Sequence, residues 1–291
     1  MQDNDTPNRP ARPRDATRPR GDAPDRSRTK KPTWVIDKER ARRASAAETV
    51  WLFGLHAVRD ALANPARERL RLVLTRNAAD RLGSIVGTSG MEPEIVDARS
   101  FDKVVPLAGE SVHQGAALEV KPLGWGKVED VVLAAPPGLR PLVVALDRVT
   151  DPHNVGAILR SAEVFGAQAV IAPARHAAPE TGALAKTASG ALERQPYLRI
   201  TNLADTLVQL KGLGYVLIAL DGTGEQALPE LLATLGTRPV CIVLGAEGPG
   251  LRDKTIETCD HVARIPFAAD FGSLNVSNAA AVALYAVRQA G

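Results

Sequence analysis

The sequence predicts an α/β protein with two folded domains behind a disordered tail. Near-continuously apolar segments such as 141–146 and 240–244 are typical of parallel strands that helices cover on both faces. Segments with strand character also alternate with segments of helical periodicity. We therefore expect a tail, a small α/β domain, a linker and a larger α/β domain, at residues 1–48, 49–121, 122–140 and 141–291.

The tail carries the positive charge of the chain. Residues 1–48 hold 13 Lys and Arg against 8 Asp and Glu, although the whole chain has a net charge of only +3. Prolines are frequent and apolar side chains are scarce before Trp34, so the segment cannot bury enough surface to offset its ordering entropy. We expect a disordered tail. We expect it to act either as a non-specific arm that gains affinity from phosphate contacts or as a solubilising extension.

The first domain shows short alternating elements, and its linker contains a brief helical stretch. The expected helices are His56–Leu62, Ala78–Val86, Ser100–Leu107 and, in the linker, Val128–Ala134. The expected strands are Leu70–Leu74, Glu94–Val96 and Ala116–Val120. This alternation over about 70 residues describes a small α/β domain.

The second domain has the clearer pattern. Its expected strands are Leu142–Leu146, Ala169–Ile171, Tyr197–Ile200, Tyr215–Leu220, Val240–Leu244 and His261–Ile265. Its expected helices are Gly156–Phe165, Gly182–Ala191, Leu203–Lys211 and a terminal helix that runs to about Val287. In open α/β sheets, ligands bind beyond the carboxyl ends of the strands, so the loops at those ends are the candidate site.

Small and polar residues gather in three of these loops: 151–156, 245–250 and 272–278. A single helix N-cap needs one Ser or Asn, whereas the last loop holds four, Ser273, Asn275, Ser277 and Asn278. Three such loops in one domain indicate one shared pocket. The loop at 245–250 has neither the Lys-Ser/Thr of a phosphate-binding loop nor the dinucleotide fingerprint, which argues against a nicotinamide dehydrogenase.

Asn154, Arg160 and Glu247 are the polar side chains most suggestive of chemistry. Asn154 and Arg160 are six residues apart, so they can converge only if Asn154 lies in the loop before the helix. The structural alternatives are that Asn154 is a helix N-cap and that Arg160 pairs with Glu163. Glu247 follows a buried strand between small residues, where a carboxylate suggests a role in a site.

Other features exclude several protein classes. The two cysteines, Cys241 and Cys259, have no metal-ligand or disulfide spacing, so we expect buried structural thiols and no metal. The sequence has no run of about 18 apolar residues and no secretory apolar region near its start. We therefore expect a soluble cytoplasmic protein without a membrane partner.

The three loops together resemble the motifs of the SpoU (TrmH-type) branch of the SPOUT methyltransferases. The matching segments are Asp151 to Ala162, Leu244 to Gly250, and Ile265-Pro266-Phe267 followed by Ser273 to Ser277. The resemblance implies methylation of an RNA ribose 2′-hydroxyl with S-adenosyl-methionine as donor. It also implies a homodimer and a trefoil-knotted parallel sheet in the second domain. The first domain is similar to the substrate-binding domain of RlmB-like members.

The resemblance also implies roles for individual residues. Gly245, Ile265 and Leu274 would hold the methyl donor, and the catalytic group would be Asn154, Arg160, Glu247, Ser273 and Asn275. The resemblance implies that Arg160 is the base, but a guanidinium stays protonated. Our preferred hypothesis is that Arg160 clamps the RNA phosphate, while Asn154 and Ser273 hydrogen-bond the hydroxyl. Residues 267–272 are bulkier and more acidic than the matching loop of the family, which affects substrate contacts near Asp270.

The leading interpretation is a methyltransferase that acts on a guanosine ribose of 23S rRNA, because the chain has both the extra first domain and the catalytic motifs. A transfer-RNA ribose methyltransferase is the alternative within the same class. A non-catalytic RNA-binding factor of ribosome assembly is the alternative from another class. The sequence does not identify the modified nucleotide.

Overall fold

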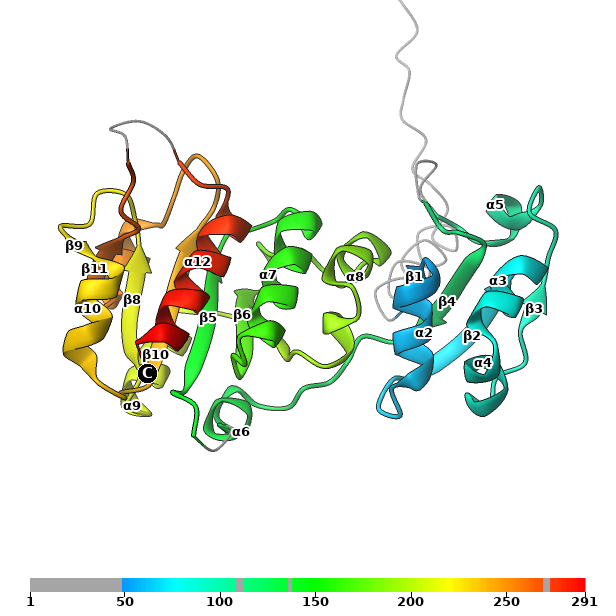
Figure 1. The fold of residues 1–291 in the computed structure, drawn as a ribbon, viewed down its shortest axis with the longest axis horizontal. Helices are drawn as coiled ribbons and strands as arrows, with labels where there is room; N and C mark the ends of the chain where they lie inside the picture. The colour runs from blue at the N-terminus through cyan, green and yellow to red at the C-terminus, as the bar shows by residue number, and fades with distance from the viewer. Residues whose placement is uncertain (1–48, 108–111, 136–137, 269–272, 291) are drawn as a thin grey trace, which may run out of the picture. The chain divides into compact units, whose positions relative to one another are not determined.

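A computed structural model describes residues 49–107, 112–135, 138–268 and 273–290. The described residues form two β-sheets with their covering helices (Figure 1), and both sheets belong to one compact unit. The expected tail at 1–48 and the expected contacts near Asp270 lie outside the described residues.

Four described strands form the smaller sheet, in the order β1-β4-β2-β3. They are β1 (Val50–Phe53), β2 (Arg69–Leu74), β3 (Glu94–Ile95) and β4 (Ala116–Val120). Strand β4 is antiparallel to β1 and β2, whereas β2 and β3 are parallel. The helices beside this sheet are α2 (Leu55–Ala63), α3 (Arg76–Leu82), α4 (Ser84–Thr88) and α5 (Phe101–Val104).

Seven described strands form the larger sheet, in the order β7-β6-β5-β10-β8-β11-β9, and every recorded pairing is parallel. The strands are β5 (Leu142–Asp147), β6 (Ala169–Pro173), β7 (Tyr197–Ile200), β8 (Val216–Leu220), β9 (Gln226–Ala227), β10 (Val240–Gly245) and β11 (His261–Arg264). The prediction of an α/β fold with a parallel sheet is confirmed. Strands β5 and β10 lie side by side at its centre, and both are buried along nearly their whole length.

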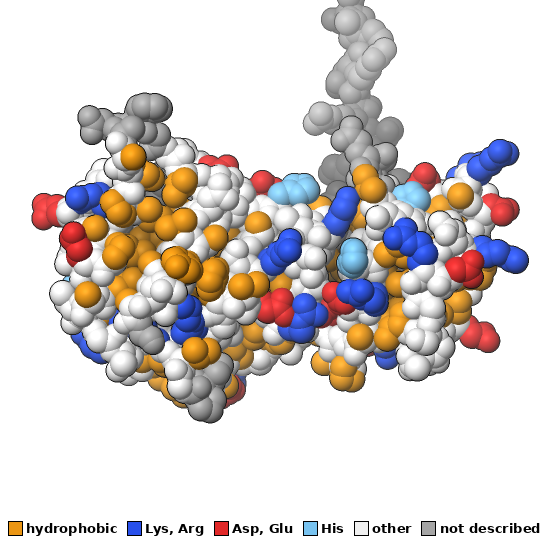
Figure 2. All heavy atoms as spheres, viewed as in Figure 1, with side chains coloured by type: hydrophobic (Ala, Val, Ile, Leu, Met, Phe, Trp, Pro, Cys, Tyr) orange, Lys and Arg blue, Asp and Glu red, His pale blue; other side chains and the backbone are white. Residues whose placement is uncertain are grey.

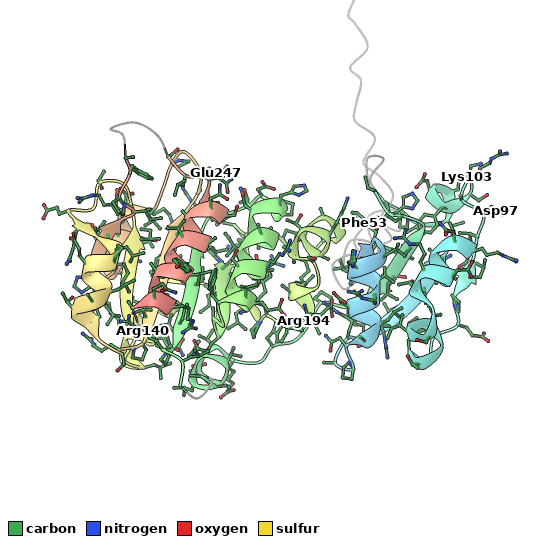
Figure 3. The ribbon with its side chains drawn as sticks, in the orientation of Figure 1. Phe53, Asp97, Lys103, Arg140, Arg194 and Glu247 are labelled. Atoms are coloured by element: carbon green, nitrogen blue, oxygen red, sulfur yellow. The ribbon has the colours of Figure 1, made fainter. Side chains whose placement is uncertain are left out.

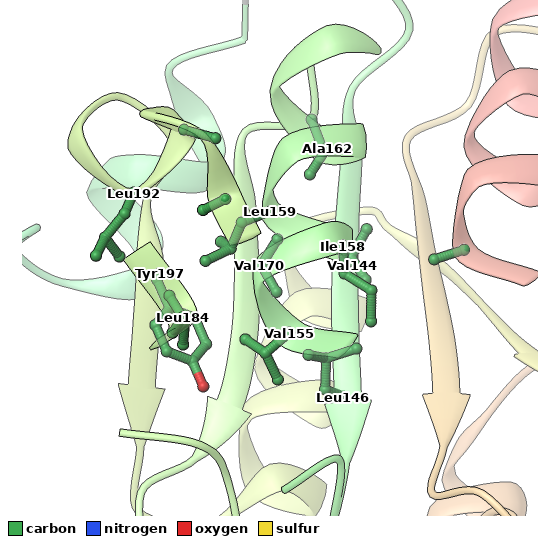
Figure 4. Packing of buried hydrophobic residues seen from close by; sticks show 14 of the residues in the cluster. Val144, Leu146, Val155, Ile158, Leu159, Ala162, Val170, Leu184, Leu192 and Tyr197 are labelled. Atoms are coloured by element: carbon green, nitrogen blue, oxygen red, sulfur yellow. The ribbon is translucent and has the colours of Figure 1, made fainter. Parts of the chain in front are cut away.

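Helices cover both faces of this sheet because successive residues of its strands point to opposite sides. Leu142, Val144 and Leu146 pack in the same apolar cluster as residues of α7, α8, α10 and α12, whereas Val143 and Ala145 pack with residues of α6 and α9. Figure 4 shows α7 side chains against the sheet. The helices are α6 (Val128–Leu133), α7 (Pro152–Val164), α8 (Gly182–Ala188), η1 (Ala191–Glu193), α9 (Leu203–Gly212), α10 (Leu228–Leu235), α11 (Asp253–Thr258) and α12 (Val276–Gln289).

The boundaries of several predicted helices were wrong. The helix expected at 78–86 is two short helices, because Gly83 has a φ of 56°, which interrupts the helical path. The helix expected at 156–165 begins earlier, since Asp151 caps it and Pro152 is its first residue. Helices α10 and α11 and strand β9 were missed.

Arg67, Glu180 and Glu193 form a buried ion cluster. It links a residue that lies near the small sheet to two residues that lie near the large sheet. Arg67 follows α2, and its side chain is 0% exposed. Its Nε and Nη2 donate to the two carboxylate oxygens of Glu193 at 3.0 and 2.7 Å, and its Nη1 donates to Glu180 at 3.1 Å and to the carbonyl of Lys121 at 2.8 Å. This two-oxygen geometry is the strong form of an arginine ion pair.

The two cysteines differ in exposure. Cys241 is buried and Cys259 is partly exposed. Burial raises the pKa of the Cys241 thiol well above its ordinary value and that of the Cys259 thiol to about 12, so neither is a reactive thiolate at neutral pH. Within the described ranges, no helix combines the length and apolar character that a bilayer crossing needs.

We predict that Arg67→Met destabilises the protein by about 3–5 kcal/mol, because it leaves two carboxylates buried without a counter-ion. The free energy of unfolding in urea measures the change. Arg59→Ala is the matched control: it removes an arginine of the same domain whose pair with Asp60 is exposed, so it changes stability by less than about 1 kcal/mol. Equal effects of the two substitutions would contradict a structural role for the cluster.

Candidate active site

The three loops identified in the sequence meet beyond the carboxyl ends of β5 and β10. Asn154 lies in the first turn of α7, Glu247 lies in the loop after β10, and Asn275 precedes α12. Figure 3 shows Glu247 beside the first turn of α12, while Arg140, just before β5, lies at the opposite end of the sheet. The register pairs Gly245 of β10 with Asp147 of β5, so the loops that follow these two strands begin at the same edge of the sheet.

The side chains of Asn154, Glu247 and Asn275 are hydrogen-bonded to one another. Glu247 Oε1 accepts from Asn154 Nδ2 at 3.3 Å, from Asn275 Nδ2 and from the backbone N–H of Val276 at 3.4 Å. Asn275 Nδ2 also donates to Asn154 Oδ1 at 3.0 Å. One carboxylate oxygen of Glu247 therefore accepts hydrogen bonds from the starts of two helices, α7 and α12. Asn154 and Asn275, at these two starts, are 121 residues apart in the chain.

Helix capping accounts for part of the polar excess. Asn275 is the N-cap of α12, and its Oδ1 accepts from the backbone N–H groups of Ser277 and Asn278 at 2.9 and 3.4 Å. Asn154 is not a cap, because Asp151 fills that position at the start of α7. Asn275 thus combines a structural role with a contact to Glu247. The Asn154 side chain, in a residue that is 8% exposed, has its recorded partners among the described residues in the other two loops.

A cavity of about 550 Å³ opens beside this hydrogen-bonded group. That volume lies within the range typical of pockets for small ligands, about 300–1,000 Å³. Every predicted donor-binding residue lines it, as do three of the predicted catalytic residues: Gly245, Ile265 and Leu274, and Glu247, Ser273 and Asn275. The structure brings these residues together, and their individual roles stay predictions.

The loop after β10 closes tightly on itself. The N–H of Gly250 donates to the carbonyl of Ala246 at 2.9 Å, and Gly248 and Gly250 have φ values of 84° and 69°, which favour glycine. A Cβ atom on Gly245 would lie 2.3 Å from the carbonyl carbon of Gly250. The glycines are therefore required by close backbone approach, whether or not a ligand is bound.

A buried carboxylate holds the end of this loop. Asp147, at the end of β5, is 0% exposed. It accepts from the backbone N–H of Arg252 at 3.1 Å, from the Arg252 side chain, whose Nη2 lies 2.7 Å from Oδ1, and from Thr255 Oγ1 at 2.7 Å. These bonds fix the segment that follows Gly250 against the neighbouring strand.

Arg160 does not join the group within one chain. Because Asn154 lies inside α7 and not before it, a separation of six residues points the two side chains in different directions. Arg160 is exposed, does not line the cavity and has no recorded hydrogen bond or ion pair with another described residue. Its suggested partner Glu163 instead pairs with Arg194.

Sequence reasoning missed some of the cavity wall. Leu220, Asp221 and Gly222 line the cavity from the end of β8, and Phe267 lines it after β11. An Asp-Gly pair directly after an apolar strand was the available signal for the first set. Clusters of three or more His, Cys, Asp or Glu side chains suited to a metal ion do not occur in the part of the chain that the structure describes.

Comparison with known proteins agrees with this geometry. Residues 141–285 match the model of the SpoU rRNA Methylase family. A 23S rRNA (guanosine-2′-O-)-methyltransferase RlmB from Photobacterium profundum is 38% identical over 249 residues, which cover 82% of this chain and 97% of the relative. The chain belongs to the SpoU rRNA methylase family. The resemblance stated from the sequence motifs is confirmed.

A further relative supports this membership, and a solved structure shares the fold. An RlmB of the same description from a Burkholderia species is 46% identical over 193 residues, or 66% of this chain and 76% of the relative. The SpoU methyltransferase AviRb from Streptomyces viridochromogenes, solved in complex with the cofactor AdoMet, has a TM-score of 0.67. It is 24% identical and covers 86% of this chain and 93% of that chain, so it shows a shared fold.

The residues of the cavity suit S-adenosyl-methionine, the methyl donor of SpoU methyltransferases. Leu244, Ile265 and Leu274 would offer apolar contact to the bound donor, and the glycines of the loop would leave backbone polar groups accessible to it. Asp221 and Glu247 place two carboxylates beside a ligand that carries a sulfonium and an ammonium group. The donor therefore fits the size and the charge of the site.

We predict that Gly245→Ala weakens S-adenosyl-methionine binding roughly 5- to 150-fold, because a strain of about 1–3 kcal/mol must displace the loop that lines the cavity. Isothermal titration calorimetry measures the dissociation constant. Gly212→Ala is the matched control, since no atom lies within 4 Å of the added Cβ and the residue lies in α9, remote from the cavity. Unchanged affinity in Gly245→Ala would show that the loop does not shape the donor site.

Proposed function

We propose that this protein transfers a methyl group from S-adenosyl-methionine to the ribose 2′-hydroxyl of a guanosine in 23S rRNA. The observation that carries the proposal is the cavity where the loops of β10, β11 and α12 meet, with Asn154 hydrogen-bonded to two of its wall residues. The curated relatives act on that RNA by their names, and the match covers 97% of the first of them. The donor supplies an electrophilic methyl group when it is bound.

The chain's own residues position the ribose. Methyl transfer requires the hydroxyl oxygen to lie in line with the bond from sulfur to the methyl group. Holding the oxygen in that position lowers the activation barrier by several kcal/mol. Asn154 keeps one amide hydrogen and one lone pair beyond its bonds to Glu247 and Asn275, and the Ser273 hydroxyl has no partner among the described residues. Both groups are available to hydrogen-bond the hydroxyl, while Glu247 fixes the orientation of the two amides.

Arg160 acts on the RNA phosphate from a second subunit. It is exposed, without a recorded partner in the described residues, and lies on a different side of α7 from Asn154. Figure 2 shows apolar side chains gathered over α10 and α12, and the exposed ones include Val282 at 43% and Tyr285 at 54%. Val164, at the end of α7, is 71% exposed. A homodimer through this apolar face would cover these side chains and bring the partner subunit's Arg160 to the pocket.

The proposal includes the domain organisation expected from the sequence. Residues 141–291 would form the catalytic domain with a trefoil knot, residues 49–121 would bind the RNA substrate, and residues 122–140 would link the two. Residues 1–48 would add RNA affinity through phosphate contacts. A cytoplasmic location is consistent with an enzyme that modifies ribosomal RNA.

We predict that the purified protein methylates 23S rRNA in the presence of labelled S-adenosyl-methionine, and that mapping of 2′-O-methyl groups places the product on one guanosine. A synthetic fragment carrying 2′-deoxyguanosine at that position accepts no label, because the reacting hydroxyl is missing. Transfer RNA is the control substrate. Preferential labelling of transfer RNA would redirect the proposal to that substrate, and donor binding without any transfer would indicate a non-catalytic factor.

We predict that Arg160→Ala and Asn154→Ala, each far below wild-type activity alone, regain activity when the two chains are co-expressed. One site of the mixed dimer then has both wild-type groups, so activity reaches about a quarter of the wild-type value if the chains pair at random. Methyl transfer to 23S rRNA is the readout. Co-expression of Arg160→Ala with Arg160→Gln is the control and stays inactive. Absence of any recovery would place Arg160 and Asn154 in the same subunit's site.

A further inference from the structure

A second cavity, of about 900 Å³, lies away from the methyl-donor pocket and shares no lining residue with it. Strand β1 of the small sheet, the linker segment 122–126 and edge strand β7 of the large sheet line it. In Figure 3, its wall residue Phe53 lies between the small sheet and α8. Its size is at the upper end of the range for small-ligand pockets.

Aromatic side chains give this cavity a stacking surface. Trp51, Phe53 and Trp125 line it, and Trp51 and Trp125 are partly exposed. The guanidinium carbon of Arg71 lies 5.8 Å from the centre of the Trp51 ring, so a cation already sits beside that ring. Exposed aromatic rings next to arginine are the usual means by which proteins hold an unstacked base.

The charge of the lining favours an anionic ligand. Among the described residues that line the cavity, Glu180 is the acidic one and Arg199 is the basic one. The Glu180 carboxylate is buried and is paired with Arg67 at 3.1 Å. Arg199 is exposed on β7 and donates one hydrogen bond, from Nη2 to the carbonyl of Ala174, so most of its donors remain available. A phosphate at the entrance would therefore meet a cation and no free carboxylate.

The walls of the cavity are held in place before any ligand arrives. Arg67 binds Glu180, a lining residue, and also the carbonyl of Lys121, which directly precedes the lining segment of the linker. The Tyr197 hydroxyl, on β7, donates to the carbonyl of Ala178 at 2.8 Å. A preformed site loses less conformational entropy when a ligand binds. The stacking of a single base can therefore contribute more fully to the binding affinity.

We propose that this cavity binds one unpaired nucleotide of the RNA substrate, with its base against Trp51 and its phosphate near Arg199. The proposal rests on the proposed function, since it assigns a second contact to the same RNA. A nucleotide held here would be distinct from the one whose ribose is methylated. It would select RNAs that present an unstacked base at a set distance from the modified guanosine.

The test measures binding of a radiolabelled 23S rRNA transcript to the full chain by filter binding over a series of salt concentrations. Trp51→Ala is expected to weaken binding roughly 5- to 150-fold, the equivalent of about 1–3 kcal/mol for one stacked base. Trp51→Phe keeps a ring and is expected to bind within about threefold of wild type. It also separates loss of stacking from loss of folding.

Arg199→Gln is expected to weaken binding and to lower the salt dependence by about 0.7–0.9 in slope, the value for one lost phosphate contact. Arg238→Gln is its matched control, because it removes an exposed arginine that does not line the cavity. All variants are expected to bind S-adenosyl-methionine with wild-type affinity, because the two cavities share no residue.

Wild-type RNA affinity in both Trp51→Ala and Arg199→Gln would overturn the proposal. Free guanosine monophosphate that quenches Trp51 fluorescence without competing with RNA would also overturn it, in favour of a free-nucleotide site. If the wild-type protein methylates 23S rRNA and these variants bind that RNA normally, only the proposal for this second cavity is wrong. A wild-type protein that neither binds nor methylates the RNA would instead remove the proposed function.

Discussion

The Glu247 carboxylate is the contact on which the geometry of the candidate active site depends. Its Oε1 accepts hydrogen bonds from two asparagine amides and one backbone N–H, which come from the starts of α7 and α12. Hydrogen bonds to a charged acceptor are stronger than neutral ones, and three donors on one oxygen constrain one another. Among the described residues, no other recorded side-chain hydrogen bond connects the β10 loop to both helices.

That contact is possible because the parallel sheet delivers its loops to one edge. Strands β5 and β10 are paired from Val240 to Gly245, so the loops that follow them leave side by side. Asp147 then uses its buried carboxylate to hold Arg252 and Thr255, which keeps the β10 loop from swinging away from β5. Two carboxylates therefore maintain the geometry of the site. Asp147 fixes the end of the β10 loop, and Glu247 connects the starts of two helices.

Sequence reasoning singled out several residues that the structure brings together, but it did not predict all of their geometry. Asn154, Glu247, Ser273 and Asn275 belong to recognisable motifs, and buried strands such as β5 and β10 have an apolar pattern that predicts a parallel sheet. The position of Arg160 could not be predicted, because it depends on whether Asn154 lies before or inside α7, a difference of a few residues at a helix start. Arg67 gave no local signal, since its partners Glu180 and Glu193 are more than a hundred residues away. Helices α10 and α11 were missed because short helices between strands have few periodic positions.

The central claim is that the three loops act as one unit through Glu247, and a double-mutant cycle tests it most directly. The rates of methyl transfer to 23S rRNA are measured for wild type, Asn154→Ala, Asn275→Ala and the double variant. Coupled residues should give a double variant little worse than the poorer single variant, with a coupling free energy of at least about 1 kcal/mol. If the losses in the two single variants instead multiply in the double variant, the two residues act independently, and the account of a single Glu247-centred unit is contradicted.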